Sequence, residues 1–291
     1  SITGSSGFDT QGISLEDQGL VAILDGSSNL ASVTDISLAS ADGQDASLTL
    51  TTDGAIELTS PQLGGDGEIA AASGQSVTIT QASDSTFGGT IEGGGLTKAG
   101  AGTLTLNGVL NYTGSTTIDG GTLVAQTDAP TLGNKTVDGT GVLRIEPKSA
   151  SFASDFVFKN WSFDQALGGL TVGKPSNESV VFVEKDTTIK GSINLYGGSI
   201  FIDRALTSTS GDIYLDADTG SMLARDRSGV YMRDANAIVQ TQAQDLIAGA
   251  IGDITIVGRG GDLSSTPELS GGVHGVYVRN GATVIANGNG N

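Results

Sequence analysis

Residues 191–215, GSINLYGGSIFIDRALTSTSGDIYL, contain the pattern that decides the fold of this chain. Residues 191–195 recur as residues 211–215, at an offset of 20. In the first copy Ile193 and Leu195 alternate with polar residues, which places the apolar side chains on one face of a strand. Twenty residues can hold two or three short strands and their corners, so the repeat predicts one coil of a β-solenoid.

A coarser repeat follows. Residues 229–234 (GVYMRD) align with residues 275–280 (GVYVRN) at an offset of 46, and the alignment runs without a gap to residues 284–285. Because both copies have the same strand-like pattern, we expect them to occupy equivalent places in the solenoid.

The GDI triplet at residues 211–213 recurs at residues 252–254, an offset of 41 that is close to two coils of 20 residues. This offset is five residues shorter than the offset of 46. The second copy therefore has five additional residues between its GDI triplet and its GVY motif, and we expect them in a loop. Helical periodicity is nearly absent. Residues 237–251 are the one stretch open to a helical reading, and we expect strand there because they align in part with the strand-like end of the chain.

The rest of the chain has the same character. Glycine accounts for 45 of the 291 residues and proline for 5, a mixture typical of short strands joined by many turns. We predict an all-β fold, a right-handed parallel β-helix with coils of about 20 residues. Similar i, i+2 apolar pairs occur in the amino-terminal half at Leu48/Leu50, Ile56/Leu58, Val77/Ile79, Leu104/Leu106 and Leu143/Ile145.

An aromatic segment interrupts the repeats. Residues 152–163 (FASDFVFKNWSF) contain four of the eight Phe and the only Trp. We expect these rings to pack in a larger core coil or loop, while the alternative is an exposed aromatic platform for a sugar ring. The segment suggests a seam, so we divide the chain into a solenoid at 1–150, a seam at 151–166 and a second solenoid at 167–291. The last solenoid is expected to be truncated from a longer array.

Composition excludes several classes of function. The chain has no Cys, and its single histidine, His274, cannot form a multi-histidine metal site. A net charge of −18 repels nucleic acid and anionic membrane surfaces, so neither is an expected partner. The sequence contains neither a membrane-spanning apolar run nor a secretion signal, so we expect a mature product or an excised fragment.

Residues 93–123, GGGLTKAGAGTLTLNGVLNYTGSTTIDGGTL, resemble the passenger-associated repeat of autotransporter proteins. The likeness lies in the GGLTK-x-G-x-GTLTL opening, the Asn-Tyr-Thr-Gly step at 111–114 and the Gly-Gly-Thr-Leu close at 120–123. Tyr112 is expected to cover a neighbouring coil. The side chains expected to point into the core are Leu96, Leu104, Leu106, Ile118 and Leu123.

From about residue 167, the GSI-x-L-x-GGSI-x-I-x-x-ALTSTSGDIYL pattern resembles the haemagglutinin-type repeats of two-partner-secreted, filamentous-haemagglutinin-like adhesins. The later GVY-x-R-x-x-A motifs are similar to repeats of large bacterial surface and biofilm-matrix proteins. Both resemblances imply a β-helix exported through an outer-membrane translocator to the surface of a Gram-negative bacterium. They leave open whether export occurs by autotransport or through a partner pore.

No catalytic residue is expected. The chain lacks a G-x-S-x-G nucleophile motif, and His274 is expected in an exposed turn. Polysaccharide-cleaving enzymes use clustered carboxylates, so clusters of Asp are candidate catalytic groups. The best clusters are Asp212 with Asp216 and Asp218, and Asp203 with Asp253 if the coils stack in register. We expect these side chains to be solvated surface charges.

No cofactor or metal is expected either, and calcium is the one ion that the sequence suggests. Asp216 and Asp218 form a D-x-D-x-G start of an oxygen-ligand loop, although the twelfth position is Arg227 in place of the Glu of an EF-hand.

The repeats favour a structural and adhesive stalk that is not an enzyme. Its expected partners are matrix polysaccharide, other cells or copies of itself. The alternative is a β-helix polysaccharide lyase or hydrolase.

Overall fold

The computed structural model divides the chain into two compact units. Unit 1 comprises Ser1–Gln126 and Thr131–Leu143, and unit 2 comprises Thr127–Pro130 and Arg144–Asn291. The boundary falls within strand β17 (Val142–Glu146). The structure describes residues 2–3, 13–16, 22–23, 36–39, 56–59, 63–65, 68–71, 74, 76–130, 132–217, 229–242, 252–259 and 274–286.

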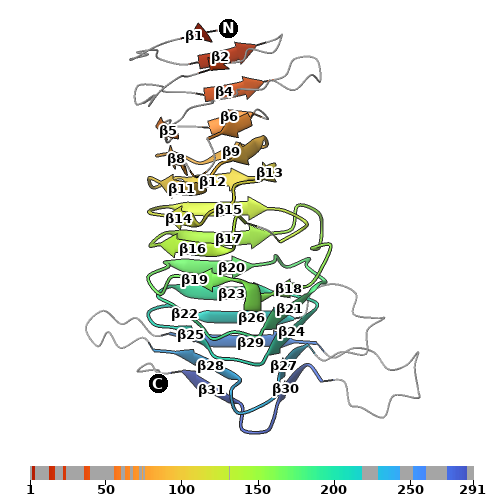
Figure 1. Ribbon diagram of the computed structural model, residues 1–291. Coiled ribbons are helices and arrows are strands. Elements are labelled where there is room, and N and C mark those ends of the chain that lie inside the picture. Colours follow the sequence, from red (N-terminus) through yellow and green to blue (C-terminus); the bar gives the residue numbers. More distant parts are fainter. Residues whose placement is uncertain are drawn as a thin grey trace. The chain divides into compact units, whose positions relative to one another are not determined.

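Unit 1 is a stack of short parallel strands in three main sheets (Figure 1). A further parallel pair joins β1 (Ile2–Thr3) and β3 (Ala22–Ile23). The first sheet contains β2 (Ile13–Glu16), β4 (Ile36–Ala39), β6 (Leu63–Gly65), β9 (Ser85–Phe87), β12 (Thr103–Leu106) and β15 (Thr122–Gln126). The second contains β5 (Ile56–Thr59), β8 (Ser76–Thr80), β11 (Gly95–Ala99), β14 (Thr116–Ile118) and β16 (Thr136–Gly139). The third contains β7 (Glu68–Ala70), β10 (Thr90–Glu92) and β13 (Val109–Leu110).

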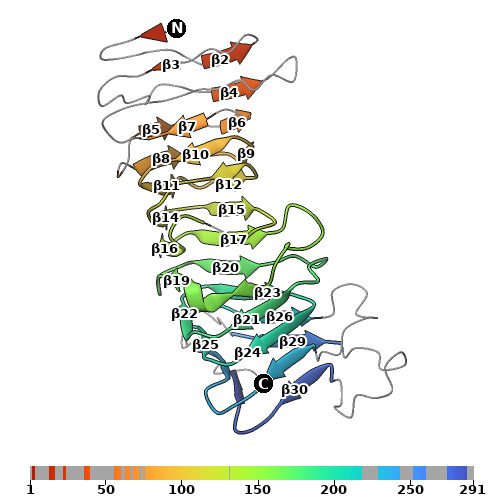
Figure 2. The same cartoon turned by 45° about the vertical axis from the view of Figure 1, so that its right-hand side comes forward.

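Unit 2 also consists of short parallel strands, which are distributed over three sheets (Figure 2). Its first sheet contains β20 (Gly169–Val172), β23 (Ser192–Tyr196), β26 (Ile213–Ala217) and β29 (Ile254–Gly258). The second, which we call the aromatic sheet, contains β18 (Phe156–Val157), β21 (Val180–Val183), β24 (Ser199–Ile202), β27 (Val230–Met232) and β30 (Val276–Val278). The third contains β22 (Thr187–Ile189), β25 (Leu206–Ser208), β28 (Ile238–Thr241) and β31 (Thr283–Ala286). One short strand, β19 (Ser162–Phe163), and one 3-10 helix, η1 (Phe158–Asn160), complete the unit.

The core of each unit follows from strand alternation. In β23 the burial alternates, with Ile193 and Leu195 fully buried and the residues beside them half-exposed. Each such side chain contributes about 1.5–3 kcal/mol by leaving water. The expected inward residues of the amino-terminal repeat are also buried, namely Leu96, Leu104, Leu106, Ile118 and Leu123. The prediction of an all-β fold of stacked parallel strands, a parallel β-helix, is therefore confirmed.

The length of the coils varies more than the sequence suggests. Ile193 pairs with Ile213, 20 residues further on, as expected. Ile213 then pairs directly with Ile254, so the offset of 41 spans one enlarged coil, and the interpretation as two coils is wrong. Parallel pairing requires that the strands stay in register, whereas the connections at the corners can lengthen freely. Residues 218–228 and 243–251, and residues 260–273 of the next coil, lie outside the described part of the chain.

The coarser repeat is correct at its start and shifts by one residue later. Val230 pairs with Val276 at the expected offset of 46, but Val239 pairs with Val284, an offset of 45. The gap-free continuation is therefore wrong. The turn that ends at Ala237 starts at Asp234, while the turn that ends at Ala282 starts one position earlier in the alignment, at Arg279. In the second turn, Asn280 (φ 54°) and Gly281 (φ 83°) adopt the left-handed conformation.

The strand expected at the start of residues 237–251 is present as β28, and residues 243–251 fall outside the described residues.

The aromatic segment packs inside unit 2. Phe152, Phe156, Phe158 and Trp161 are all buried, and the Trp161 ring stacks at 5.3 Å from the ring of Phe156. Burial of four of the five rings agrees with the expected core packing and leaves no exposed platform made of these four. The boundaries at residues 150 and 166 stay a prediction.

A charged side chain lies within the core of unit 1. Lys98 is fully buried on β11, in the column between Ile79 and Ile118 of the adjacent strands. Its ammonium donates hydrogen bonds to the carbonyl oxygens of Ala99 (2.9 Å), Gly100 (2.8 Å) and Gly120 (3.1 Å). The methylene groups of Lys98 pack against the isoleucines, while its ammonium is hydrogen-bonded to carbonyl oxygens at a corner of two successive coils.

Candidate binding surface

The outer face of the aromatic sheet carries a column of rings. Strand alternation points one residue outward from each of four successive strands, and the register places them side by side. We call this set the aromatic column: Phe182, Phe201, Tyr231 and Tyr277. Ring centroids lie 5.2 Å apart for Phe182 and Phe201, 5.7 Å for Phe201 and Tyr231, and 5.2 Å for Tyr231 and Tyr277. All four rings are half-exposed, so the column forms an apolar strip on the surface of unit 2.

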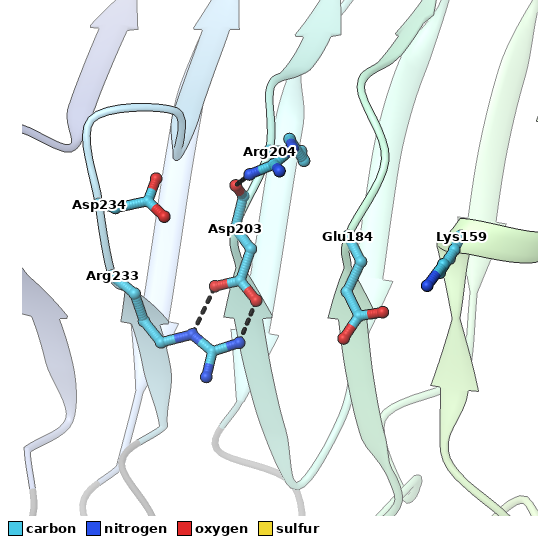
Figure 3. A pocket seen from close by; sticks show the side chains of 6 residues that line it. All are labelled: Lys159, Glu184, Asp203, Arg204, Arg233 and Asp234. Carbon is cyan, nitrogen blue, oxygen red and sulfur yellow. Dashed lines mark hydrogen bonds and ion pairs between the residues drawn. The ribbon is translucent and has the colours of Figure 1, made fainter.

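A second outward column, two residues further along each strand, is charged. It contains Glu184 after β21, Asp203 after β24, Arg233 after β27 and Arg279 after β30. Part of this column lines a groove of about 500 Å³, shown in Figure 3. We call it the charged groove, and its lining residues are Lys159, Glu184, Asp203, Arg204, Arg233 and Asp234.

One ion pair organises the centre of the groove. Arg233 donates from Nε and Nη2 to the two carboxylate oxygens of Asp203, a bidentate arrangement visible in Figure 3. The hydrogen bond that Arg233 donates to Asp203 raises the pKa of Arg233, against a smaller lowering by burial. Arg204 donates from Nη1 to the backbone carbonyl of Asp203 at 2.8 Å. The groove therefore has a fixed centre made of one carboxylate and two guanidinium groups.

The two columns are joined by arginines that lie over rings. The guanidinium carbon of Arg233 is 5.5 Å from the centroid of Phe201, and that of Arg279 is 5.3 Å from the centroid of Tyr231. These distances are typical of cation–π contacts. His274 is exposed, and its ring stacks on Tyr277 at 4.4 Å. Planar groups therefore continue across the surface of the sheet.

The carboxylates singled out by the sequence do not form one cluster. Asp203 neighbours Arg233 in the aromatic sheet, whereas Asp253 immediately precedes β29 of another sheet. The candidate Asp203–Asp253 cluster, which required the two coils to stack in register, is therefore not formed. Asp253 instead follows Asp212 in register, and its backbone N–H donates to Asp212 Oδ1 at 2.9 Å.

The calcium candidates are only partly described. Asp216 is half-buried and accepts a hydrogen bond from the Tyr214 hydroxyl at 3.3 Å, while Asp218 lies outside the described residues. Within the described ranges, no group of three or more acidic or histidine side chains is arranged to hold a metal ion.

The sequence reasoning missed the charged groove and the aromatic column. A signal was present, because Phe182, Phe201, Tyr231 and Tyr277 each stand between two apolar residues of a strand. Such a position faces outward when its neighbours face inward.

Comparison with known proteins addresses the amino-terminal repeat. Residues 96–125 match the passenger-associated-transport-repeat family. This match confirms the resemblance to the autotransporter passenger repeat, and it implies a bacterial protein that is secreted or displayed at the cell surface. No curated protein and no solved structure matched the chain. The likeness to two-partner-secreted haemagglutinins is not separately shown and stays a prediction.

The passenger-associated repeat contains buried residues with polar groups. Besides Lys98, it includes Tyr112, whose buried hydroxyl lies 2.6 Å from Thr116 Oγ1. A Cβ on Gly133 would come within 2.5 Å of the Tyr112 ring, so the ring packs tightly against the adjacent coil, as expected. Burial raises the pKa of Tyr112, against a smaller lowering by the hydrogen bond with Thr116. In the described part of the chain, no helix has the length and apolarity needed to cross a membrane.

Proposed function

We propose that this chain is a structural and adhesive module of a bacterial surface protein, exported through an outer-membrane translocator of a Gram-negative cell. The observation that carries the proposal is the parallel stacking of coils, which presents equivalent outward positions again and again. The aromatic column shows the consequence, since one strand position yields four neighbouring rings. Weak contacts repeated along such a surface add to a strong attachment.

The partners proposed for this module are matrix polysaccharide, other cells and copies of itself. A repeated surface suits ligands that are themselves repetitive, because each additional contact forms at a high effective concentration. The module is proposed to bind without chemical turnover. The bidentate Arg233–Asp203 pair supports this view, because the guanidinium of Arg233 engages both carboxylate oxygens of Asp203.

Attachment and turnover can be measured on the same sample. Beads coated with the purified chain are expected to bind polysaccharide-coated surfaces and bacterial cells, with no release of oligosaccharides on long incubation with acidic and neutral polysaccharides. Release that is lost in Asp212→Asn, Asp216→Asn or Glu184→Gln would establish the lyase or hydrolase alternative instead. Failure of the beads to attach to any cell or polysaccharide would refute the adhesive role.

The module is also proposed to act without a cofactor. Thermal unfolding in the presence of calcium and in the presence of a chelator is therefore expected to give the same midpoint. A calcium-dependent rise that disappears in Asp216→Asn would show that the candidate loop binds the ion.

A further inference from the structure

We propose that the charged groove and the aromatic column bind a polysaccharide chain that carries carboxylate groups. This inference rests on the adhesive function proposed above and assigns its ligand class and its place on unit 2. The argument proceeds from the local charge, the available donors and the shape of the surface.

The local charge differs from that of the whole chain. Acidic residues outnumber basic ones by 32 to 14 overall. Within three residues after the strands of the aromatic sheet, however, the basic residues are Lys159, Lys185, Arg204, Arg233 and Arg279, and the acidic residues are Glu184, Asp186, Asp203 and Asp234. This edge therefore holds more than a third of all basic residues and only an eighth of the acidic ones. An anionic ligand is repelled less here than by the remainder of the chain.

Three cations at this edge have donors to offer. Arg233 is engaged by Asp203, and Lys185 donates to the carbonyl of Trp161 at 2.7 Å. In contrast, the side chains of Lys159 and Arg279 make no ion pair or hydrogen bond with any other described residue, and both are exposed. The exposed Arg204 donates to the carbonyl of Asp203, and its side chain makes no other hydrogen bond or ion pair with a described residue. A guanidinium group binds a carboxylate through two parallel hydrogen bonds, which favours carboxylated ligands over neutral ones.

The orientation of Arg279 makes it the best anchor. Its guanidinium lies over both Tyr231 (5.3 Å) and Tyr277 (5.8 Å). The stacking restricts the plane of the group while its N–H edge stays available, so less freedom is lost on binding. A sugar ring whose carboxylate reaches Arg279 would then place its C–H face against the half-exposed aromatic column, which combines the apolar and polar contacts typical of ligand sites.

The shape of the surface favours a chain over a compact ligand. The charged groove extends from Lys159 on η1 past β21 and β24 to β27, across successive strands about 4.8 Å apart (Figure 3). Arg279, directly after β30, continues the same column. A linear polymer can follow this direction and meet a basic residue after each strand of the aromatic sheet, so its affinity grows with length.

The test uses polygalacturonic acid and the same polymer after reduction of its carboxyl groups, with the full chain and binding measured by calorimetry and affinity electrophoresis. We expect at least tenfold weaker binding of the reduced polymer, and weaker binding of the acid polymer as salt increases. The Arg204→Ala/Arg279→Ala double variant should lose at least tenfold in affinity. Arg279→Lys should lie between, because it keeps the charge and loses the planar fork. Lys190→Ala, which removes an exposed charge after β22, is the matched control and should bind as the wild type does.

A sign-specific variant strengthens the test. Glu184→Gln removes an exposed carboxylate from the groove and should tighten binding of the acid polymer, because it removes repulsion. Circular dichroism of every variant confirms that the fold is kept.

Equal binding of both polymers, or undiminished binding by the double variant, would overturn the inference. Displacement of the acid polymer by polyglutamate at equal charge concentration would also overturn it, by showing attraction between charges alone. The ligand assignment can fail while the adhesive function stands. That is the outcome if the wild type shows no preference for the carboxylated polymer and the double variant still attaches to cells. Loss of all attachment by the wild type would instead refute the adhesive function.

Discussion

Replacing Lys98 by Met tests whether a buried ammonium holds a corner of the passenger-associated repeat. Methionine keeps an unbranched stem of similar size between Ile79 and Ile118 and removes the three hydrogen bonds to the carbonyls of Ala99, Gly100 and Gly120. Hydrogen bonds to a charged group contribute about 1.5–3 kcal/mol each, whereas the variant avoids the cost of burying the ammonium, which is several kcal/mol. We expect a net destabilisation of about 2–4 kcal/mol.

The assay is urea unfolding followed by circular dichroism, with hydrogen exchange of residues 99–121 to locate the effect. Lys190→Met is the control, because Lys190 is exposed and its loss should change the midpoint little. In Lys98→Met, faster exchange should be concentrated in the two coils that the ammonium joins. An unchanged midpoint together with unchanged exchange would refute the reasoning.

The pH dependence provides a second readout of Lys98. Burial lowers the pKa of Lys98, against a smaller rise caused by Asp84. Between that lowered pKa and about 10.4, the value in an unfolded chain, the unfolded state binds more protons, so this group makes stability rise with pH. Lys98→Met lacks this contribution. The stability difference between wild type and variant should therefore increase as the pH approaches 10.

Three other changes have defined outcomes. Tyr112→Phe should cost about 1 kcal/mol at pH 8, because it removes the hydrogen bond to Thr116. The raised pKa of Tyr112 makes the stability of the wild type fall above about pH 10. The urea midpoint of the variant should therefore fall less than that of the wild type in this pH range. Gly100→Ala should destabilise the fold by more than about 3 kcal/mol, because the new Cβ would overlap the backbone carbonyl of Gln81. Gly74 has a similar positive φ but no atom within 4 Å of the position that a Cβ would take, so Gly74→Ala should cost about 1–2 kcal/mol in the same unfolding assay. Equal losses in the two variants would contradict this account. The side chains of three valines continue inward columns yet are exposed, namely Val276 (43%), Val278 (44%) and Val284 (44%). The chain should therefore associate through this apolar surface in sedimentation experiments, and Val278→Lys should weaken the association more than Val109→Lys. A strict monomer at high protein and salt concentration would refute the idea.

Much of the scaffold could be predicted from local pattern. The pairing of Ile193 with Ile213 was visible as an offset of 20, because parallel stacking requires the same apolar alternation in each coil. The position of Lys98 was also open to prediction. Lys98 follows Leu96 by two residues, and the alternation that places Leu96 inward places Lys98 inward as well. The usual preference of lysine for water obscured this, since the carbonyls that satisfy its charge are recognised only when the corners are built.

The surface of unit 2 shows where prediction stops. The ion pair of Arg233 with Asp203 joins residues 30 positions apart, across a connection whose length the apolar pattern does not fix. For the same reason the apolar pattern does not reveal that the offset of 41 spans one enlarged coil, or that Asp203 and Asp253 follow and precede strands of different sheets.

The sequence by itself determined the strand alternation, the class of fold and the passenger-associated repeat, because each depends on residues close together in the chain. Only the tertiary structure decided which coils are neighbours and hence which outward side chains form the aromatic column and the charged groove. The physical reason is that register is set by burying the inner face, while outer side chains meet as a consequence of that register.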